Sequence, residues 1–247
     1  MGKVKSLSID LYGDDIGSVD YIQHMGSDLT IVNAARVSFG AEKKRLDAKD
    51  KKLIKYLIKH RHTSVLEHNF VTFRFKVPLF IRSQHHRHRT WSYNEISKRY
   101  VSTNLGFYEP ESFRTQHKTN RQASNDDNID PEIEWSDATH HEVKASEVIR
   151  SHHIYCHKLY DDMIEAGICR EQARGVLPQN AYTEYYGSCN LNNLLKFIEL
   201  RTHDGAQWEI QQVANACLKI AEELWPETIK AYKQINTFSD SVQKFLD

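Results

Sequence analysis

The segment FVTFRFKVPLFIRSQHHRHR, residues 70–89, passes from one amphipathic pattern to another. In residues 70–77 apolar and other side chains alternate, which is the pattern of a strand with one buried face. The apolar side chains on that face are Val71, Phe73, Phe75 and Val77. Pro78 follows, and a proline suits the first turn of a helix because its missing N–H is not needed there. We therefore predict a strand over residues 70–77 and a helix over residues 78–89.

The sequence before this segment predicts one strand and two helices. Residues 4–12 alternate like a half-buried strand. A helix is predicted over residues 28–37, with Ser27 or Asp28 as its N-cap, because a short polar side chain can accept hydrogen bonds from the first turn. A second helix is predicted over residues 49–60, where apolar residues recur at helical spacing.

After the segment, a long polar stretch interrupts the pattern. Residues 115–140 contain few side chains large enough for a core, so we predict an inserted surface loop or a partly disordered excursion, not a domain. The elements predicted beyond it are helices over 142–166 and 170–177, a strand over 183–190, and helices over 191–201 and 206–225. In the first of these helices, the residues available for burial are Val148, Ile149, Ile154, Tyr155, Leu159 and Met163. Strands and helices alternate without a regular βαβ rhythm and no GxGxxG motif follows a strand, so a Rossmann fold is disfavoured.

Composition narrows the class of protein. The chain has 247 residues, enough for one large domain or two small ones, and its 33 basic and 33 acidic residues balance. A protein held on nucleic acid by general electrostatics is usually basic, so any anion site here must come from local clustering. No secretory signal or membrane-length apolar run is recognisable, and the cysteines lack metal-binding spacing. We predict a cytoplasmic protein with reduced thiols at Cys156, Cys169, Cys189 and Cys217.

Local clustering of cations is found in RHRTWSYNEISKRY, residues 87–100. Between Arg82 and Tyr100 the only acid is Glu95. The cations over the same range are Arg82, Arg87, Arg89, Lys98 and Arg99. Planar guanidinium groups suit phosphate and carboxylate oxygens because two N–H groups meet two oxygens at once, and nearby serine hydroxyls can add further bonds. The stretch therefore predicts a site for one or two phosphorylated small molecules.

Three other interpretations of this stretch are open at this point. The first is a basic surface patch, which does not account for the interleaved Ser, Asn and Glu. The second is a zinc site at His85, His86 and His88, which the neighbouring arginines disfavour because they repel a cation. The third is RNA binding with aromatic stacking platforms, which the zero net charge disfavours. Those aromatic residues are Trp91, Tyr93 and Tyr100.

The stretch RHRTWSYNEISKRY resembles the signature of flavin-dependent thymidylate synthases, RHRxxSxNExSxRY, at every specified position. Three further segments resemble that family: RHTSVLEH at 61–68, which is similar to its HxSPFEH segment, ARGVLPQN at 173–180, and LRTHDGAQWEIQQ at 200–212. The resemblance covers the chain from about residue 20 to residue 230. The departures are Val65 and Leu66 in place of Pro and Phe, Gly205 in place of a common His, and Lys196 where a neutral or His side chain is frequent.

The resemblance implies a fold, a reaction and an assembly. The fold would be mixed α+β, a twisted, largely antiparallel sheet flanked by helices, in one domain over residues 1–247 with a polar insertion at about 115–140. The reaction would be the reductive methylation of dUMP to dTMP, with 5,10-methylenetetrahydrofolate as carbon donor and FAD, reduced by NADPH, as hydride donor. The protein would be a homotetramer with active sites built by several subunits, and no metal, nucleic acid or membrane would take part. The alternative is a nucleotide- or RNA-binding module without turnover, and bound flavin would distinguish the two.

The same resemblance assigns residues to roles. Cofactor-binding residues would be Ser64, Glu67, Arg87, His88, Arg89, Glu95, Asn190, Asn192 and Lys196. Substrate-binding residues would be Gln84, His85, His86, Arg87, Glu95, Ile96, Ser97, Lys98, Arg99, Arg174 and Arg201. Arg201 would also be catalytic, because a guanidinium at the uracil ring stabilises the negative charge that develops there. Ser97 would bind rather than attack, since no base of the Ser–His–Asp kind is evident. Without the resemblance, Glu67 would be interpreted as a helix-cap carboxylate and Arg174 as a surface ion-pair partner.

Overall fold

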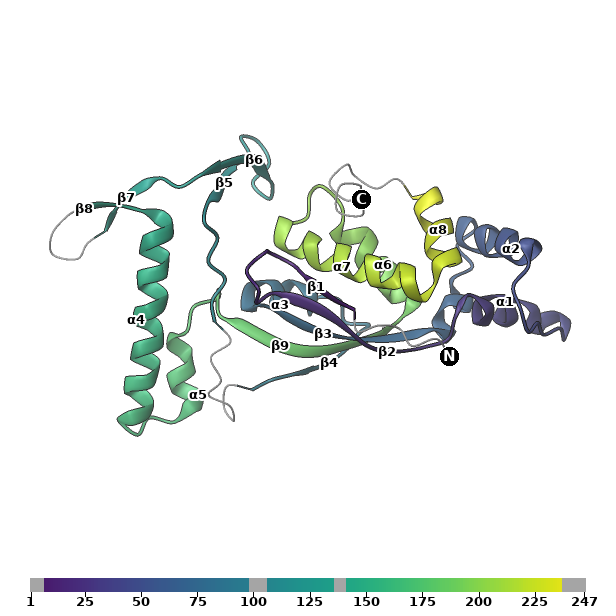
Figure 1. Cartoon of the computed structure of the whole chain (residues 1–247), viewed down its shortest axis with the longest axis horizontal. Helices are drawn as coiled ribbons and strands as arrows, with labels where there is room; N and C mark the ends of the chain where they lie inside the picture. The colour runs from purple at the N-terminus through teal and green to yellow at the C-terminus, as the bar shows by residue number, and fades with distance from the viewer. Residues whose placement is uncertain (1–6, 98–105, 136–140, 237–247) are drawn as a thin grey trace. The chain divides into compact units, whose positions relative to one another are not determined.

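The structure is a computed structural model that describes residues 7–97, 106–135 and 141–236 (Figure 1). Two predicted site residues, Lys98 and Arg99, lie outside these described residues. The chain forms two compact units. The first unit consists of residues 1–76, 84–94 and 185–247, and the second consists of residues 77–83 and 95–184. The stretch that resembles the family signature therefore contributes residues to both units.

A five-stranded sheet has the order β1-β2-β3-β9-β4. Its strands are β1 (Ser8–Asp10), β2 (Ser18–Met25), β3 (Phe70–Pro78), β4 (Ser92–Glu95) and β9 (Tyr182–Asn190). Strand β2 pairs antiparallel with both β1 and β3, and Val19 lies opposite Phe75. The strands predicted over 70–77 and 183–190 are confirmed, and the one predicted over 4–12 is observed as β1. The antiparallel sheet flanked by helices agrees with the expected fold class.

Two strands of this sheet, β2 and β4, were not predicted from the sequence. In β2, the register shifts between Tyr21 and Gln23, and a bulge of this kind interrupts the alternation of side chains. Strand β4 has only 4 residues, SYNE, and none of them is aliphatic. Short or irregular strands offer too few repeats for a period-2 pattern to be recognised.

Strand β3 leads directly into helix α3 (Leu79–His85). The predicted buried face of β3 is confirmed, since its members Val71, Phe73, Phe75 and Val77 are at most 1% exposed. Pro78 is the last residue of the strand rather than the first of the helix. The helix starts one residue later, where the backbone N–H of Leu79 donates to the carbonyl oxygen of Ala181 (3.0 Å).

Helix α3 is shorter than the helix predicted over residues 78–89. The carbonyl oxygen of His85 accepts the backbone N–H of His88 (2.9 Å) and the hydroxyl of Tyr93 (3.0 Å). A carbonyl has two lone pairs, so none is left for the N–H of Arg89, which would continue the helix. The chain leaves α3 through tight turns instead, and the prediction of a longer helix was wrong.

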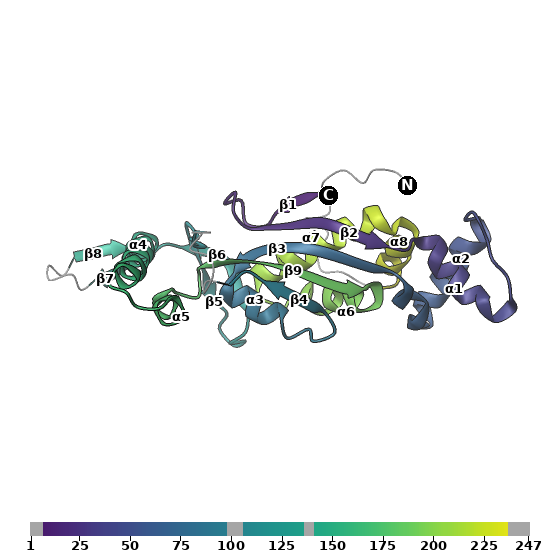
Figure 2. The same cartoon turned by 90° about the horizontal axis from the view of Figure 1, so that it is seen from below.

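The first unit contains helices that pack on the sheet or lie beyond its end (Figures 1 and 2). They are α1 (Asp28–Arg36), α2 (Ala48–Lys59), α6 (Leu191–Arg201), α7 (Trp208–Leu224) and α8 (Pro226–Ile235), with the 3₁₀ helices η1 (Val37–Phe39) and η2 (Thr63–His68). Helix α7 contacts β2 and α6, and α8 contacts α7 and α2. The helices predicted in this unit are confirmed, whereas α8 was not predicted. No helix among the residues that the structure describes is long and apolar enough to span a membrane.

The Asp28 carboxylate connects helix α1 with the start of helix α8. Ser27 is the N-cap of α1, as predicted, with a capping box to Thr30. The Asp28 side chain accepts the backbone N–H of Glu227 (3.0 Å) and of Thr228 (2.9 Å). These N–H groups belong to the first turn of α8, where an intrahelical acceptor is missing, so Asp28 stabilises the start of that helix.

The second unit is built around α4 (Ala145–Glu165), which packs against α5 (Arg170–Ala173) and η3 (Arg174–Val176) (Figures 1 and 2). The helix predicted over 142–166 is confirmed from Ala145 onward, but residues 142–144 belong to a strand, so its predicted start was wrong. The helix predicted over 170–177 is observed as α5 followed by η3. Gly167 follows α4 with φ at +86°, a left-handed conformation that glycine adopts readily at the end of a helix.

The buried side of α4 differs from the one expected. The buried residues are Val148, His153, Cys156 and Tyr160. Ile154 and Tyr155 are 65% and 64% exposed. His153 takes an inner position because its Nδ1 lies 2.8 Å from Oε1 of Glu109, which satisfies a polar group that would otherwise disfavour burial.

The polar stretch predicted as a surface loop contains two hairpins. Strand β5 (Phe113–Gln116) pairs antiparallel with β6 (Ser124–Ile129), and β7 (Glu132–Trp135) with β8 (His141–Lys144). The first hairpin is held partly by side chains, since Asn125 Nδ2 donates to Thr115 Oγ1 at 2.9 Å. Most of its side chains are exposed, so neither face carries an apolar pattern, and the loop prediction was wrong for this reason.

Candidate functional site

The α3–β4 segment (residues 84–94) rests on an aromatic cluster in the first unit. His85 is fully buried, and its Nδ1 lies 2.8 Å from the Tyr185 hydroxyl. The other rings around it, with centroids 4.7–5.3 Å away, are Phe75, Trp91, Tyr93 and Phe197. Burial lowers the pKa of His85 well below its ordinary value, so the ring is neutral. A fully buried ring offers no surface to a ligand, so His85 supports the segment rather than meeting the substrate as expected.

Two arginines of the segment are exposed above this cluster. Arg87 and Arg89 make no side-chain hydrogen bond or ion pair within the part of the chain that the structure describes. The backbone that carries them is fixed by turns, since the N–H of Arg87 donates to the carbonyl of Gln84 (3.3 Å) and that of Arg89 to the carbonyl of Arg87 (3.1 Å). Exposed guanidiniums on a fixed backbone suit the phosphate groups that the sequence predicts as ligands.

A third guanidinium reaches the same segment from α6. Arg201 Nε donates to Nε2 of His88 (3.0 Å), and Arg201 Nη2 donates to the carbonyl oxygen of Gln84 (3.3 Å). The face of α6 that anchors it is buried through Leu194, Leu195, Phe197 and Ile198. Burial lowers the pKa of Arg201, and burial together with the charge of Arg201 lowers the pKa of His88 to about 4. A residue predicted to bind the cofactor and one predicted to bind the uracil are therefore bonded to each other.

The N-terminal end of α6 contacts both η2 and the α3–β4 segment. Asn190 caps the helix by accepting the backbone N–H of Asn193 (2.9 Å), and Asn193 Nδ2 donates to the carbonyl of Thr90 (3.5 Å). Asn192 Nδ2 donates to Oε1 of Glu67 (2.8 Å). Asn192 is 4% exposed, so it lies behind the exposed carboxylate and orients it. Predicted cofactor residues from two distant segments, η2 and the start of α6, thus meet at the helix end, where the helix dipole favours anions.

One predicted substrate residue of the second unit, Glu95, is held by two side chains that were not predicted as site residues. Glu95 Oε1 accepts the hydroxyl of Thr183 (2.7 Å) and forms an ion pair with Arg82 Nε (3.3 Å). The backbone N–H of Ile96 donates to the carbonyl of Glu184 (2.9 Å), which continues the strand pairing beyond β4. Glu95 is therefore held in a defined orientation by its own unit.

Other predicted residues are placed on the surface. Arg174 is exposed in η3, and its Nε donates to the carbonyl of Glu171 (3.4 Å), not to a carboxylate. Ser64 and Lys196 are exposed on η2 and α6. The His86 ring packs against the rings of Tyr93 and Tyr185 with centroids 4.1 and 5.0 Å apart. Gly205 is exposed beside the His203 ring.

Several contact residues were not predicted from the sequence. Gln84 Nε2 donates to Oε1 of Gln207 (2.5 Å), and Gln207 Nε2 donates to Oε2 of Glu209 (2.8 Å). Gln207 and Glu209 belong to LRTHDGAQWEIQQ, a segment that resembles the family. That resemblance could have predicted them as site residues. Thr183 and Tyr185 gave no signal beyond the strand pattern, because their partners lie about ninety or a hundred positions away in the chain.

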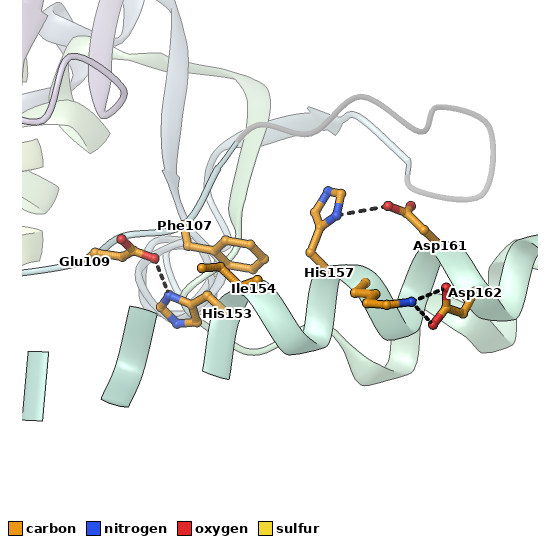
Figure 3. A pocket seen from close by; sticks show the side chains of 8 residues that line it. Phe107, Glu109, His153, Ile154, His157, Asp161 and Asp162 are labelled. Carbon is orange, nitrogen blue, oxygen red and sulfur yellow. Dashed lines mark hydrogen bonds and ion pairs between the residues drawn. The ribbon is translucent and has the colours of Figure 1, made fainter. Parts of the chain in front are cut away.

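A separate cavity of about 500 Å³ lies along α4 in the second unit (Figure 3). Its lining residues are Phe107, Glu109, His153, Ile154, His157, Lys158, Asp161 and Asp162. The carboxylates are paired, Glu109 with His153 (2.8 Å), Asp161 with His157 (3.0 Å) and Asp162 with Lys158 (2.7 Å). Over the described ranges, no three His, Cys, Asp or Glu side chains are placed to share a metal ion. Each lining carboxylate therefore already has a His or Lys partner inside the cavity. None of the predicted site residues lines it.

Comparison with known proteins gives one consistent result. Residues 20–227 match the family described as thymidylate synthase complementing protein. The chain is 42% identical over 220 residues to the flavin-dependent thymidylate synthase of Thermus thermophilus, covering 89% of this chain and 77% of that protein. It is 40% identical over 220 residues to that of Thermotoga neapolitana, covering 88% and 91%. Among solved structures, the UMP/dUMP methylase PolB from Streptomyces cacaoi, bound with 5-Br UMP, superposes with a TM-score of 0.73 at 32% identity, covering 94% of this chain and 99% of that one.

Proposed function

The chain belongs to the flavin-dependent thymidylate synthase family, flavoprotein methyltransferases that convert dUMP to dTMP, and from this premise we propose how its residues divide the reaction. Three parts of the first unit take part: the α3–β4 segment, η2 and helix α6. The second unit adds the dUMP-binding residues around Glu95. A carboxylate in each unit is held by neighbours of that unit, Glu67 by Asn192 and Glu95 by Arg82 and Thr183, which supports a preset orientation of each carboxylate within its own unit.

FAD is the proposed flavin, with NADPH as its reductant and 5,10-methylenetetrahydrofolate as the carbon donor. The residues present fit a dinucleotide with two phosphates, because Arg87 and Arg89 are exposed and have no partner among the described residues. Ser64 and the Asn192-bound Glu67 add polar groups near the N-terminal end of α6. When bound, the flavin supplies the hydride that completes the methyl group.

Arg201 is the proposed catalytic residue. Methylation needs electron density on ring carbon 5 of uracil, and a guanidinium at the ring stabilises the negative charge that develops there. The α6 face that carries Arg201 is buried, so the side chain projects from a fixed backbone. Its two bonds to the α3–β4 segment hold the plane of the guanidinium before substrate binds.

The dUMP site is proposed to comprise Gln84, Arg87, Glu95, Ile96, Ser97, Lys98, Arg99 and Arg174, with Arg201 at the ring. Ser97 binds the nucleotide and does not attack it. Arg174 meets the phosphate, and its exposed position in η3 leaves the guanidinium accessible to an anion. His86 and Lys196 are proposed as lesser contacts to substrate and cofactor.

A homotetramer that completes each active site from several subunits is proposed as the assembly. The exposed apolar side chains of the chain support it, because large apolar groups on a surface commonly mark protein contacts. Phe39 in the first unit is 85% exposed, and Ile154 in the second is 65% exposed.

The observation that carries the function is the meeting of three segments in one unit: the α3–β4 segment, η2 and α6 are joined by the Asn192–Glu67, Asn193–Thr90 and Arg201–His88 bonds. The test is an anaerobic assay of purified protein with dUMP, methylenetetrahydrofolate and NADPH, omitting one component at a time. We expect bound FAD and dTMP formation that requires all three. A protein that binds dUMP and flavin and forms no dTMP would instead be the binding module.

A further inference from the structure

The middle residue of the Arg87–His88–Arg89 run is engaged differently from its neighbours. We propose that His88 is a positioning residue, whose Nε2 accepts the Nε–H of Arg201 and thereby directs the far edge of that guanidinium at the pyrimidine. This inference rests on the proposed function of Arg201. It replaces the expected contact between His88 and the flavin with a contact inside the protein.

The geometry of a guanidinium gives this bond its directing effect. The group is planar and carries five N–H donors in fixed directions. Nε and Nη2 of Arg201 are used by His88 and by the carbonyl of Gln84. No other acceptor among the described residues meets Arg201, so the remaining N–H groups of Nη1 and Nη2 are available to a ligand. Because the plane is rigid, two bonds on one edge set the direction of the opposite edge.

His88 is itself held in place. Its carbonyl shares the hydroxyl proton of Tyr93 with the carbonyl of His85 (3.1 and 3.0 Å), and its backbone N–H donates to the carbonyl of His85 (2.9 Å). The ring of Phe197 meets the His88 ring edge to face, with centroids 4.9 Å apart. Phe197 lies on α6, the helix that also carries Arg201, so one helix fixes both the acceptor ring and the donor.

The bond requires a particular form of the imidazole. Arg201 Nε can only donate, so Nε2 of His88 must lack a proton and Nδ1 must carry it. Burial and the adjacent positive charge lower the pKa of His88 to about 4, which agrees with a neutral ring. A protonated ring would place two cations side by side and break the bond.

The experiment compares two substitutions of His88 with different hydrogen-bonding capacity. His88→Gln places an amide oxygen near the position of Nε2 and keeps an acceptor, whereas His88→Leu keeps bulk and removes it. We expect His88→Leu to lower the kcat for dTMP by about 10-fold or more, as when a hydrogen bond to a charged group is lost. His88→Gln should retain most of the activity. Both variants should keep FAD content and NADPH-dependent flavin reduction within about 2-fold, since the bond acts on Arg201.

A double-mutant cycle separates positioning from general packing. In an Arg201→Lys background the Nε–H is gone, so His88→Leu should lower dTMP formation by less than about 2-fold further. His157→Leu, at a half-buried histidine of α4 that also has one side-chain partner, Asp161, is the matched control in both backgrounds. Equal losses in His88→Leu and His88→Gln, additive losses in the cycle, or a parallel loss of FAD would each overturn the proposal. Wild-type protein that is reduced by NADPH yet forms no dTMP would overturn the proposed function, and the inference with it.

Discussion

Two polar parts of this chain are ordered in opposite ways. The α3–β4 segment lies on buried aromatic rings, and its Arg87 and Arg89 have no side-chain partner among the described residues. In the β5–β6 hairpin of the second unit, polar side chains bond to each other, as Arg114 Nε does to Ser124 Oγ (3.0 Å). The first part is ordered by what is packed beneath it, and the second by contacts among its own surface groups.

The difference shows where a polar side chain is available for a ligand. When packing fixes the backbone, the polar groups above it need not bond to each other, so they can bind something else. When there is no packed base, local hydrogen bonds provide the order and use the same groups. We therefore expect substitutions to affect function strongly in the α3–β4 segment and its contacts with α6, and weakly in the hairpin.

The largest effect is expected at Arg201. Arg201→Lys keeps the charge and loses the planar fork, so dTMP formation should fall by about 10²-fold or more, in the range seen when one preorganised charge-stabilising donor is removed. Flavin reduction by NADPH should change much less, since that half-reaction needs no charge on uracil. The measurement is a pair of rates, anaerobic flavin reduction and dTMP production, on the same variant.

The matched control for this substitution is Arg150→Lys in the second unit, where the arginine is exposed and forms an ion pair with Glu109 at 3.5 Å. It should leave both rates near those of the wild type. If both rates of Arg201→Lys stay near wild type, Arg201 does not activate the pyrimidine. If both fall together, Arg201 holds the flavin or the fold.

A smaller effect is expected on flavin retention. Arg89→Ala removes one exposed guanidinium, and a charge-assisted phosphate contact contributes roughly 1.5–3 kcal/mol, so the Kd for FAD should rise by about 10-fold to 100-fold. Arg114→Ala in the hairpin removes an arginine whose Nε is bonded to Ser124, and it should leave FAD binding unchanged. Titration of the apoprotein with FAD measures both. Equal affinities in the two variants would remove the distinction between the two regions.

The next effect concerns acid stability. The pKa of His88 is about 4 in the folded chain against an ordinary 6.5, and that of His85 is also lowered, so the unfolded chain binds protons first as pH falls. Protons bound by the unfolded state favour it, so the free energy of unfolding should decrease as pH drops from 6.5 towards 4. His88→Gln should make that decrease shallower, as measured by urea unfolding at each pH. A slope unchanged by the substitution would contradict a neutral, half-buried His88.

The smallest effect is expected in the hairpin. Phe113 pairs with Ile129, so residues 114–128 can be replaced by an Asn-Gly turn that keeps these two residues opposite each other. We expect FAD content and dTMP formation to stay within about 2-fold of wild type, because the deleted side chains mainly bond to each other. Size-exclusion chromatography provides the second readout. Loss of the wild-type oligomer would show that the hairpin carries subunit contacts.

Sequence patterns predicted the parts of the fold that have a repeated apolar face. Phe73 and Phe75 on β3 were recognised because burial repeats at a fixed period, and helix α6 was predicted over the residues that it occupies. The end of α3 was missed, because it depends on Tyr93 donating to the His85 carbonyl, a contact that no local pattern encodes. The β5–β6 hairpin was missed because its strands have no buried face.

The candidate site was predicted residue by residue from family motifs, but the contacts among those residues were not. The motifs name His88 and Arg201 as separate ligand contacts, whereas the structure bonds one to the other across 113 positions. They also name His85 as a substrate contact, whereas the aromatic cluster buries it completely. Such pairings follow from packing between distant segments, which a single sequence does not display.

Helix α6 contacts the α3–β4 segment near both of its ends, through Asn193 and through Arg201. Between these two residues a helix rises by about 12 Å, and one inserted residue would turn the following side chains by about 100° and move them by about 1.5 Å. Arg201 would then leave His88, whereas an insertion at the tip of the β5–β6 hairpin would only lengthen a turn. Side chains on α6 can therefore be substituted one at a time during evolution. Insertions and deletions between Asn193 and Arg201 cannot be tolerated in the same way, because they would separate Arg201 from His88.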